Sequence, residues 1–454
     1  MTLADGLGIF FTIHELAISY DTLTGSLLGA IPSHRKSPNA GFPMLARFSL
    51  YGFLKNQQYY DPFLILAFRE KGLTFFQIGL LIGFREICIN LLEIPSGAVA
   101  DLYGRRRAMI LSFSAYILSF TAFAISRTLQ ALFGAMLLFA IGEVFRTGTH
   151  KAMIFDWLRL QRRTHEKTKI YGYTRSWAKM GSALSVLIAS ALVFFTGKYS
   201  TIFWFSILPY LLNIVNLLGY PAVLDGDRKR TFSMKAVAEF LGKGLKQATQ
   251  HAPLRRLIAE SMGFEGLFKA SKDYLQPILN QAAMALPLFL MLDDRRRAAL
   301  LVGAVFFVLH ILSSIASRRA HHLATWRGGE EHVARFIWGG NALLFACLIP
   351  LLYFRLYPLV IVCFVVLAIT QNFWRPVMVS RINRHATPEM GATMLSIESQ
   401  ATSFATMCMA PLFGWMVDAA GAFWPVGVAG TVVTMAFVIR GQRSGTRDQG
   451  SAES

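Results

Sequence analysis

Charged and polar side chains recur at helical spacing within segments of this chain that are otherwise apolar. The residues that share this pattern are Glu86, Asn90 and Glu93, then Glu143, Arg146 and His150, then Glu265, Lys269 and Asp273. Spacings of three or four residues place such side chains on one face of a helix. A face of this kind can bind a polar solute, or it can take up and release protons. The alternative is structural, because opposite charges one turn apart, such as Glu265 and Lys269, neutralise each other.

The same residue types form no recognisable catalytic or metal-binding pattern. Cysteine, histidine and carboxylate spacings suit no metal, and the sequence contains no nucleophile constellation and no phosphate-binding loop. We therefore expect no enzyme activity, no metal and no cofactor. Because a nucleotide-binding motif is also missing, any uphill process would draw its energy from a gradient and not from ATP.

The segments that hold these side chains are too apolar for a soluble protein. Of the 454 residues, 54% are hydrophobic and 16% are charged, whereas soluble domains average about 25% charged residues. The stretch from Met109 to Ser126 has no charged residue, and about 20 mainly apolar residues suffice for a helix to cross a bilayer. Soluble enzymes and DNA-binding proteins are excluded. In a membrane protein the net charge of +19 is explained mainly by the lysines and arginines of cytoplasmic loops, which set the orientation of the chain in the membrane.

Twelve segments are expected to cross the membrane as helices. They cover residues 47–68, 75–100, 108–126, 130–157, 171–196, 200–222, 256–280, 298–316, 333–353, 356–380, 392–416 and 422–439. We predict an all-α integral membrane protein in which twelve transmembrane helices form two six-helix repeats around a central cavity. Its parts would be an N-terminal arm (1–46), a first half (47–222), a cytoplasmic linker (223–255), a second half (256–440) and a flexible tail (441–454).

Basic residues are distributed unequally between the loops. If the N-terminus is inside, most loop lysines and arginines fall on the cytoplasmic side, which predicts that both termini are cytoplasmic. The cluster Asp293-Asp294-Arg295-Arg296-Arg297 is the exception, because it is basic where this topology places it outside. Within the linker, residues 234–247 are expected to form a basic amphipathic helix on the membrane surface.

The first and seventh segments resemble each other. Gly52-Phe-Leu-Lys55 is followed by Tyr59-x-x-Pro62, and Gly266-Leu-Phe-Lys269 is followed by Tyr274-x-x-Pro277. Their position at the head of each half favours an internal duplication over chance. Parallel repeats related about the membrane normal are one architecture of transporters, with the solute site at the repeat interface near the middle of the membrane.

The proposed cavity would take its polar lining from several helices. The candidate set is completed by Lys55, Tyr59 and Asp61 in the first segment, and by Arg85 beside Glu86. Charges at membrane depth are costly and usually face a cavity or a partner. Glu86 and Glu143 are the leading candidates for a carboxylate that takes up a proton in one conformation and releases it in another, with Glu93 next. The alternative is a permanent Glu–Arg pair that holds helices together.

The junction of the second and third segments carries a motif. It reads Gly97-Ala-Val-Ala-Asp101-Leu-Tyr-Gly104-Arg105-Arg106-Arg107 and resembles the G-x-L-A-D-x-x-G-R-[KR] signature of the major facilitator superfamily. Gly97 would allow close helix approach, Asp101 could accept hydrogen bonds at a helix end, and the arginines would anchor the turn at the lipid headgroups. The resemblance implies that this motif, and Asp101 above all, helps to hold two halves together in one conformation.

Other stretches extend the resemblance to roughly residues 47–440. Leu92–Gly97, Gly142–Lys151 and Ala392–Ser396 look like a poorly characterised bacterial branch of the superfamily. The fifth segment lacks the family's Gly-Pro antiporter pattern, which argues against a drug:proton antiporter. Gly414-Trp-Met-Val-Asp418-Ala-Ala-Gly421 has a spacing like that of the motif but would lie outside, so we interpret it as a close-packing helix end.

These observations favour a secondary active transporter that moves a small polar or charged solute by alternating access, with proton coupling as a hypothesis. The alternatives are an uncoupled facilitator and a non-transporting membrane scaffold that retains the transporter fold. The expected partners are a small-molecule solute, protons and the lipid bilayer, without nucleic acid. We expect a monomer in the cell inner membrane.

Overall fold

The computed structural model describes residues 44–225, 242, 246, 249–287, 289–324, 329–386 and 391–450, and every regular element in these ranges is a helix. The predicted all-α class is thus confirmed for the described residues. The expected arm up to residue 43 lies outside them. So do most of the expected amphipathic helix at 234–247 and the last four residues of the expected tail.

The helices with defined bounds lie before residue 226 or after residue 251, and we refer to these two sets as the first and second helix groups. The first group contains α2 (Met44–Lys55), η1 (Asp61–Phe63), α3 (Leu64–Glu70), α4 (Phe75–Tyr103), α5 (Arg105–Ile125), α6 (Leu129–Arg146), α7 (Thr149–Leu160), η2 (Thr164–Glu166), α8 (Lys167–Thr196), α9 (Thr201–Leu218) and η3 (Ala222–Asp225). The second group contains α11 (Ala252–Ser271), η4 (Lys272–Tyr274), α12 (Leu275–Ala285), α13 (Asp294–Ala324), α14 (Gly329–Tyr353), α15 (Tyr357–His385), α16 (Gly391–Ala420) and α17 (Trp424–Gly450).

Local sequence sets both ends of α4. At its start, the Thr74 hydroxyl accepts a hydrogen bond from the Gln77 backbone N–H, and the Gln77 side chain accepts one from the Thr74 N–H, which completes a capping box. At its end, Gly104 has φ 101°, a value that residues with a Cβ rarely adopt. A Cβ at this position would also lie 3.0 Å from the carboxyl carbon of Asp225. The tight turn into α5 therefore requires glycine.

Both copies of the internal repeat fold as broken helices. In the first copy α2 ends at Lys55, and the chain resumes with Pro62 in η1 before α3. In the second copy α11 ends at Ser271, η4 follows, and Pro277 lies in the first turn of α12. Proline is favoured at helix starts because it lacks a backbone N–H. The segments expected at 47–68 and 256–280 are therefore not continuous helices. The segment expected at 130–157 also breaks, at Gly148 with φ 78°.

Among the residues that the structure describes, eight helical stretches are long and apolar enough to cross a membrane. They are 75–93, 105–125, 129–160, 164–196, 201–218, 294–319, 329–353 and 357–385, and the apolar stretch 424–439 is shorter. Large apolar side chains on α9 remain exposed, among them Trp204, Leu208 and Val215 at 50–66% exposure. Apolar surface of this extent on a helix flank is suited to lipid. The protein is therefore a multi-pass membrane protein.

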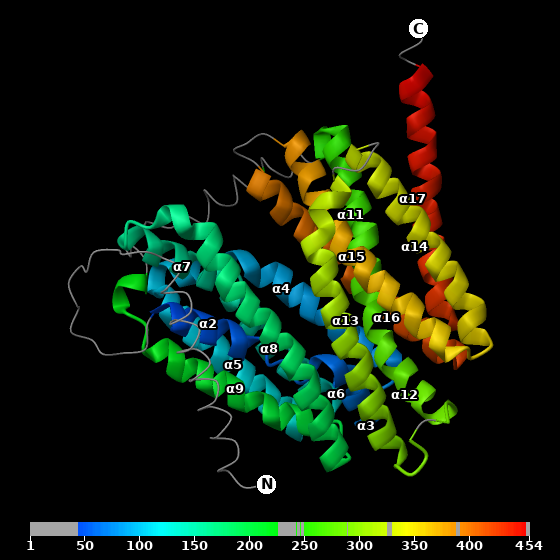
Figure 1. The fold of residues 1–454 in the computed structure, drawn as a ribbon, viewed down its shortest axis with the longest axis horizontal. Helices are drawn as coiled ribbons and strands as arrows, with labels where there is room; N and C mark the ends of the chain where they lie inside the picture. The colour runs from blue at the N-terminus through cyan, green and yellow to red at the C-terminus, as the bar shows by residue number, and fades with distance from the viewer. Residues whose placement is uncertain are drawn as a thin grey trace, which may run out of the picture. The chain divides into compact units, whose positions relative to one another are not determined.

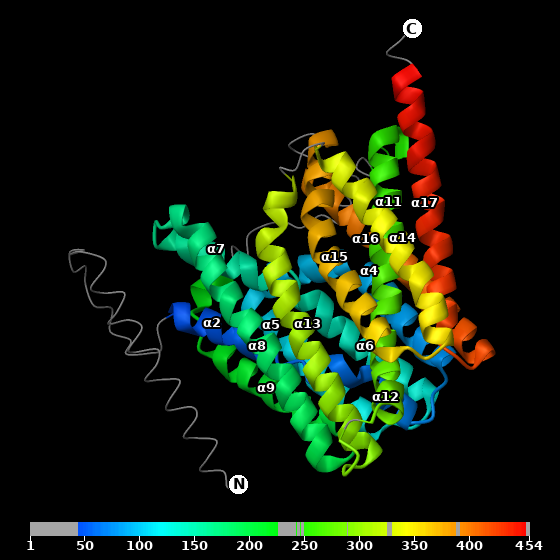
Figure 2. The same cartoon turned by 45° about the vertical axis from the view of Figure 1, so that its right-hand side comes forward.

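Two helix pairs make the most extensive contacts between the groups, with α4 along α16 and α8 along α13, and α12 and α13 also contact α3 and η1. Figures 1 and 2 both show α8 beside α13. Glycine permits the close approach of α4 and α16, because a Cβ on Gly83 would lie 2.9 Å from the carbonyl oxygen of Met407. Gly414 of α16 in turn faces the backbone of Phe75 and Phe76 at the start of α4. The predicted close-packing role of Gly414 is thus observed.

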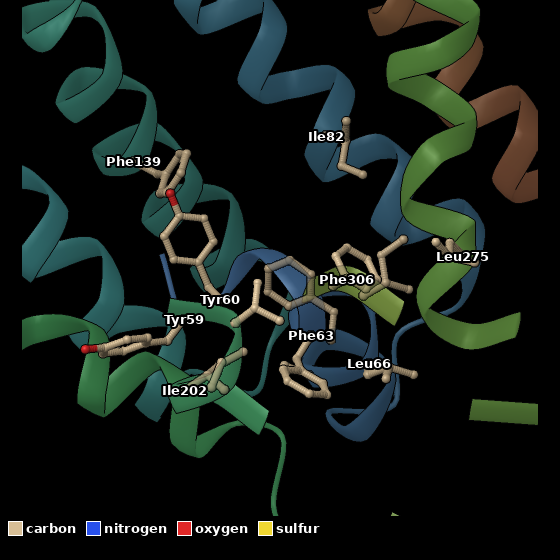
Figure 3. Close-up of a cluster of buried hydrophobic side chains, with 14 of the residues drawn as sticks. Tyr59, Tyr60, Phe63, Leu66, Ile82, Phe139, Ile202, Leu275 and Phe306 are labelled. Atoms are coloured by element: carbon tan, nitrogen blue, oxygen red, sulfur yellow. The ribbon is translucent and has the colours of Figure 1, made fainter. Parts of the chain in front are cut away.

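A hydrophobic cluster fills the region around the break between α2 and α3. Figure 3 shows Phe63 of η1 near Leu275 of α12 and Phe306 of α13, with Ile82 of α4 above them. All four belong to one buried core, and Phe63 is completely buried. Because these side chains come from both helix groups, burial of their apolar area stabilises the contact between the groups.

Candidate functional site

Three side chains form a compact polar cluster within the first helix group. Glu143 lies near the end of α6, where its two oxygens are bound separately. The Tyr116 hydroxyl of α5 donates to Oε1 at 2.6 Å, and Arg146 Nη2 lies 2.5 Å from Oε2. Arg146 Nε also donates to the Tyr116 hydroxyl at 3.1 Å. The charges balance within this partly buried cluster, and removal of one partner would leave the other charge without compensation.

His150 is enclosed by aromatic rings. It lies on α7, where the ring of Tyr51 stacks on it at 3.6 Å and a hydrogen bond of 3.1 Å links its Nε2 to the Tyr220 hydroxyl. Its exposed fraction is 9%. Although Lys55 at the end of α2 is near enough to act on it electrostatically, His150 forms part of an aromatic packing cluster in this conformation. This differs from the expected place of His150 in the cavity lining.

The charged face of α4 lies toward the second helix group. Arg85 Nη2 is 2.8 Å from Glu86 Oε1, so these sequence neighbours form an ion pair. Further along, the Asn90 side chain donates to the Gln400 carbonyl of α16 at 3.3 Å. Lys269 of α11 interacts electrostatically with both Glu86 and Glu93. The predicted face on α4 therefore meets charged and polar groups of α11 and α16.

A second meeting point lies at the two helix breaks. Gln276 of α12 donates to the Asp61 carbonyl at 2.8 Å and accepts from the Ile65 N–H at 2.9 Å. The Gln276 side chain, which belongs to the second helix group, thus forms two hydrogen bonds with the backbone at the break between α2 and α3 in the first group. Beside it, Lys272 Nζ is 2.9 Å from Asp273 Oδ1, and the Asp61 carboxylate also acts on Lys272.

Tyr59 was expected with these polar residues, but it belongs to the buried hydrophobic core instead. Its side chain appears among the cluster of Figure 3. The tyrosine follows directly on the break after α2, where its large ring gains more from apolar burial than from a polar setting.

Glu265 has a different partner from the one suggested by its spacing. The alternative in which Lys269 neutralises Glu265 names only part of the surroundings, because Lys269 acts on Glu265 electrostatically while the ion-pair contact of Glu265 is with Arg375 of α15, whose Nη1 lies 3.7 Å from Glu265 Oε1. The same nitrogen donates to both oxygens of Glu398 on α16, at 2.7 and 2.8 Å. Sequence reasoning missed Arg375 and Glu398 because neither belongs to a periodic face. Each is nevertheless a charge inside an apolar segment, which is itself an indication of function.

The motif residues mostly bind within the first helix group. Arg105 of α5 forms an ion pair with Asp156 of α7, and Arg106 Nη1 donates to the Tyr220 carbonyl at 2.9 Å. Asp225, which the sequence analysis did not single out, accepts from the Arg106 N–H at 3.0 Å and so caps α5. The close packing expected of Gly97 is wrong, because a Cβ there would meet nothing within 4 Å.

At the start of α4, a carboxylate from the second group caps the helix. Asp418 at the end of α16 accepts hydrogen bonds from the backbone N–H groups of Phe75 at 3.1 Å and Phe76 at 2.7 Å. A carboxylate at this position satisfies free N–H groups and interacts favourably with the helix dipole. The Asp418 carboxylate therefore has two effects: it caps α4, and it links α16 of the second helix group to α4 of the first. The side chain of Asp101, the acidic residue of the motif itself, lies outside the described part.

The basic cluster at 293–297 makes further links at the same end of the molecule. Arg295 Nη1 is 3.1 Å from Glu70 Oε1 and donates to the Gly197 carbonyl at 2.6 Å. Arg296 donates to the Phe194 carbonyl at 3.2 Å. Both carbonyls belong to the C-terminal end of α8, where positive charge is favourable. Arg295 and Arg296 thus bond groups of α3 and α8. These contacts explain why basic residues occur in a loop that the predicted topology places outside.

Comparison with known proteins places this arrangement in a family. A model of the Major Facilitator Superfamily matches residues 52–354. The structure of the nucleoside transporter NupG is similar, with a TM-score of 0.73 at 13% identity over 88% of this chain and 99% of that chain. A POT family transporter in complex with a thioalcohol conjugated peptide has a TM-score of 0.66 at 14% identity, over 88% and 96% of the chains.

Structural similarity at 13–14% sequence identity shows that the fold is shared, but not the function. A search of the curated proteins found no match. The family model nevertheless covers well over half of the sequence, in agreement with the resemblance of the Gly97–Arg107 motif. The chain belongs to the major facilitator superfamily.

Proposed function

We propose that the protein is a secondary transporter that moves a small polar or charged solute across the membrane by alternating access of two halves, residues 47–222 and 256–440. Family membership and the fold shared with nucleoside and peptide transporters support a transporter. Twelve membrane-crossing segments, both termini in the cytoplasm and an inner-membrane location complete the proposal. The broken helices α2–α3 and α11–α12 would then act as the first crossing of each half.

The proposal depends chiefly on one observation, which is that charged side chains of the two helix groups meet. Lys269 of α11 acts electrostatically on Glu86 and Glu93 of α4. Among the described residues, no carboxylate comes within 4.0 Å of its ammonium group. An ammonium group without a fixed counter-ion can bind an acidic or strongly polar group of a solute. Lys55, its counterpart in the repeat, lies near Arg146 and Glu143, so each half offers one such lysine.

The bonds of Asp418, Glu70 and Gln276 suggest which state this is. They join the two groups at the end where α4 begins, and the proposed topology places that end outside. We therefore assign the structure to a state closed toward the outside. Proton coupling through a carboxylate inside the membrane belongs to this proposal, with the uncoupled facilitator as its alternative; Glu86, Glu143 and Glu93 are the carboxylates that the sequence favoured.

A solute screen on the purified protein tests this function. A solute present at 100 times its Kd raises the free energy of unfolding by about 2.7 kcal/mol, which is visible as a higher melting temperature. We expect acidic or strongly polar solutes to stabilise the wild type and the Lys198→Met control, whose lysine is exposed. The Lys269→Met variant should lose that stabilisation, and uptake into proteoliposomes should fall with it.

Two results would contradict the proposal at different points. A solute that is taken up equally by wild type and Lys269→Met would remove Lys269 from the site. If a broad screen yields neither stabilisation nor uptake for any solute, the scaffold alternative is favoured over transport.

A further inference from the structure

Two buried carboxylates share one guanidinium within the second helix group. Glu265 of α11 is 6% exposed and Glu398 of α16 is completely buried. Arg375 of α15 donates to both oxygens of Glu398 at 2.7 and 2.8 Å, while its distance to Glu265 Oε1 is 3.7 Å. The Ser261 hydroxyl also donates to Glu398 Oε1. Three helices thus meet at a cluster that holds two acidic groups and one basic group.

The hydrogen bonds of this cluster are incomplete. Glu398 receives donors on both oxygens, but Glu265 Oε1 is buried and accepts no hydrogen bond from the described residues. Gln371 of α15 interacts with the Glu265 side chain, and its own Oε1 is a second buried acceptor without a donor among the described residues. An acceptor left unbonded in the interior typically costs about 1–3 kcal/mol. The cluster therefore lacks one donor.

The charges of the cluster are also incomplete. Two carboxylates against one guanidinium leave one negative charge without compensation, and a buried charge is very costly unless it is paired. Lys269 on the same helix acts on Glu265, but it is shared with Glu86 and Glu93 of α4. Glu86 has Arg85 as its own partner. The three carboxylates of Glu93, Glu265 and Glu398 then face two positive charges, those of Lys269 and Arg375. One negative charge therefore remains uncompensated.

The neighbouring helix on the remaining side offers no compensation. α17 packs against α11, and its residues 424–439 contain no ionisable side chain. A single added positive charge that is also a hydrogen-bond donor would correct both deficits. A proton is such an addition.

We propose that Glu265, Glu398 and Arg375 form a proton-binding site, with the proton carried on Glu265. This inference rests on the proposed transport function and deepens it by placing the coupling ion in the second helix group. The proton comes from water and forms the O–H bond of a neutral carboxylic acid, which can donate to Gln371 Oε1. When the proton returns to water, Glu265 is again a carboxylate and competes with Glu398 for Arg375. Because the three groups lie on α11, α16 and α15, that competition links proton release to the packing of three helices.

The carboxylates favoured by sequence spacing lack these features. Glu143 accepts one donor on each oxygen and is balanced by Arg146. Glu86 is likewise balanced by Arg85. Both fit the alternative of permanent pairs that hold helices together, and the proton site moves to the cluster with the charge imbalance.

Infrared spectroscopy of the purified full-length protein tests the site without any knowledge of the solute. A protonated carboxylic acid has a C=O stretching band that is distinct from the carboxylate bands and shifts in heavy water. We expect the wild type to show such a band near pH 7, where ordinary Asp and Glu side chains with pKa values of about 4 are ionised, and to lose it as the pH is raised further. Glu265→Gln and Glu398→Gln should each abolish the band, since each leaves one carboxylate with one guanidinium. The matched control is Glu330→Gln, a buried glutamate that has Arg384 to itself, and it should retain the band.

The infrared results test the proton-binding site independently of the proposed transport function. A titrating band that persists in either folded glutamine variant, or the absence of such a band in the wild type, would overturn the inference. If one variant does not fold, the other decides. A solute that is transported by a protein without the band would remove this site and leave the transport function intact. The band in a protein for which no solute is found would support the site and count against transport.

Discussion

Removal of the Asp418 carboxylate should shift the balance between the two transport states. The carboxylate caps α4 with bonds of 2.7 and 3.1 Å, yet it belongs to α16 in the opposite helix group. In the alternating-access cycle proposed above, the two halves would separate at this end, so the cap would exist in only one of the states. A contact made in one state alone changes the equilibrium by its full free energy.

The size of the shift follows from the nature of the bond. Loss of a capping side chain costs about 0.5–2 kcal/mol. Asp418 is exposed, and solvent weakens its charged interactions, so we take about 1 kcal/mol. Since 1.4 kcal/mol corresponds to a tenfold change in an equilibrium constant, Asp418→Ala should lower the ratio of the state described here, which we propose to be closed toward the outside, to the alternative state by about fivefold.

Electron paramagnetic resonance can measure that ratio. Spin labels at the exposed positions 160 in α7 and 319 in α13 report the separation of the two groups, once the exposed Cys347 and Cys408 are replaced. The matched control is Thr128→Ala. Thr128 caps α6 by accepting from the Ala131 N–H at 3.4 Å, entirely within the first group.

The control separates loss of stability from loss of the link. Both variants should lower the melting temperature slightly, because both remove a cap. Only Asp418→Ala should redistribute the label distances. Equal distance distributions in Asp418→Ala and wild type would refute the reasoning, and so would an equal shift in Thr128→Ala.

Composition and one motif sufficed to predict the class of this protein. The long apolar stretches and the sequence from Gly97 to Arg107 led to a helical membrane protein of the superfamily, and the family match confirms it. The helix breaks were not predicted, because hydropathy averaged over about 20 residues is insensitive to single positions. Pro62 and Gly148 do mark two of the breaks, so the local signals were present in the sequence.

The partners of charged residues were harder to predict. Spacing along one helix brings Lys269 near Glu265, but the shortest ion-pair contact of Glu265 is with Arg375 on another helix. Periodicity describes one helix face and contains no information about which helix packs against it. The cap from Asp418 was missed for the same reason, since the sequence shows a helix end but not the neighbouring helix that starts beside it. Pairings within one segment, such as Arg85 with Glu86, could be anticipated because they depend on local geometry.

Two further substitutions probe the packing on which these proposals depend. Tyr116→Phe removes the donor to Glu143 Oε1 and should lower the free energy of unfolding by about 1–3 kcal/mol, measured by chemical denaturation; an unchanged value would show that water replaces the hydroxyl. Gly79→Val adds a side chain where a Cβ already collides with the Ala410 backbone of α16. Overpacking of this kind costs about 1–3 kcal/mol, and the cost falls on the contact between helix groups, so the closed state should lose population in the label measurement. Gly134→Val is the matched control, because a Cβ there meets nothing within 4 Å; a similar loss in both variants would mean that the effect comes from valine in a helix and not from the contact between α4 and α16.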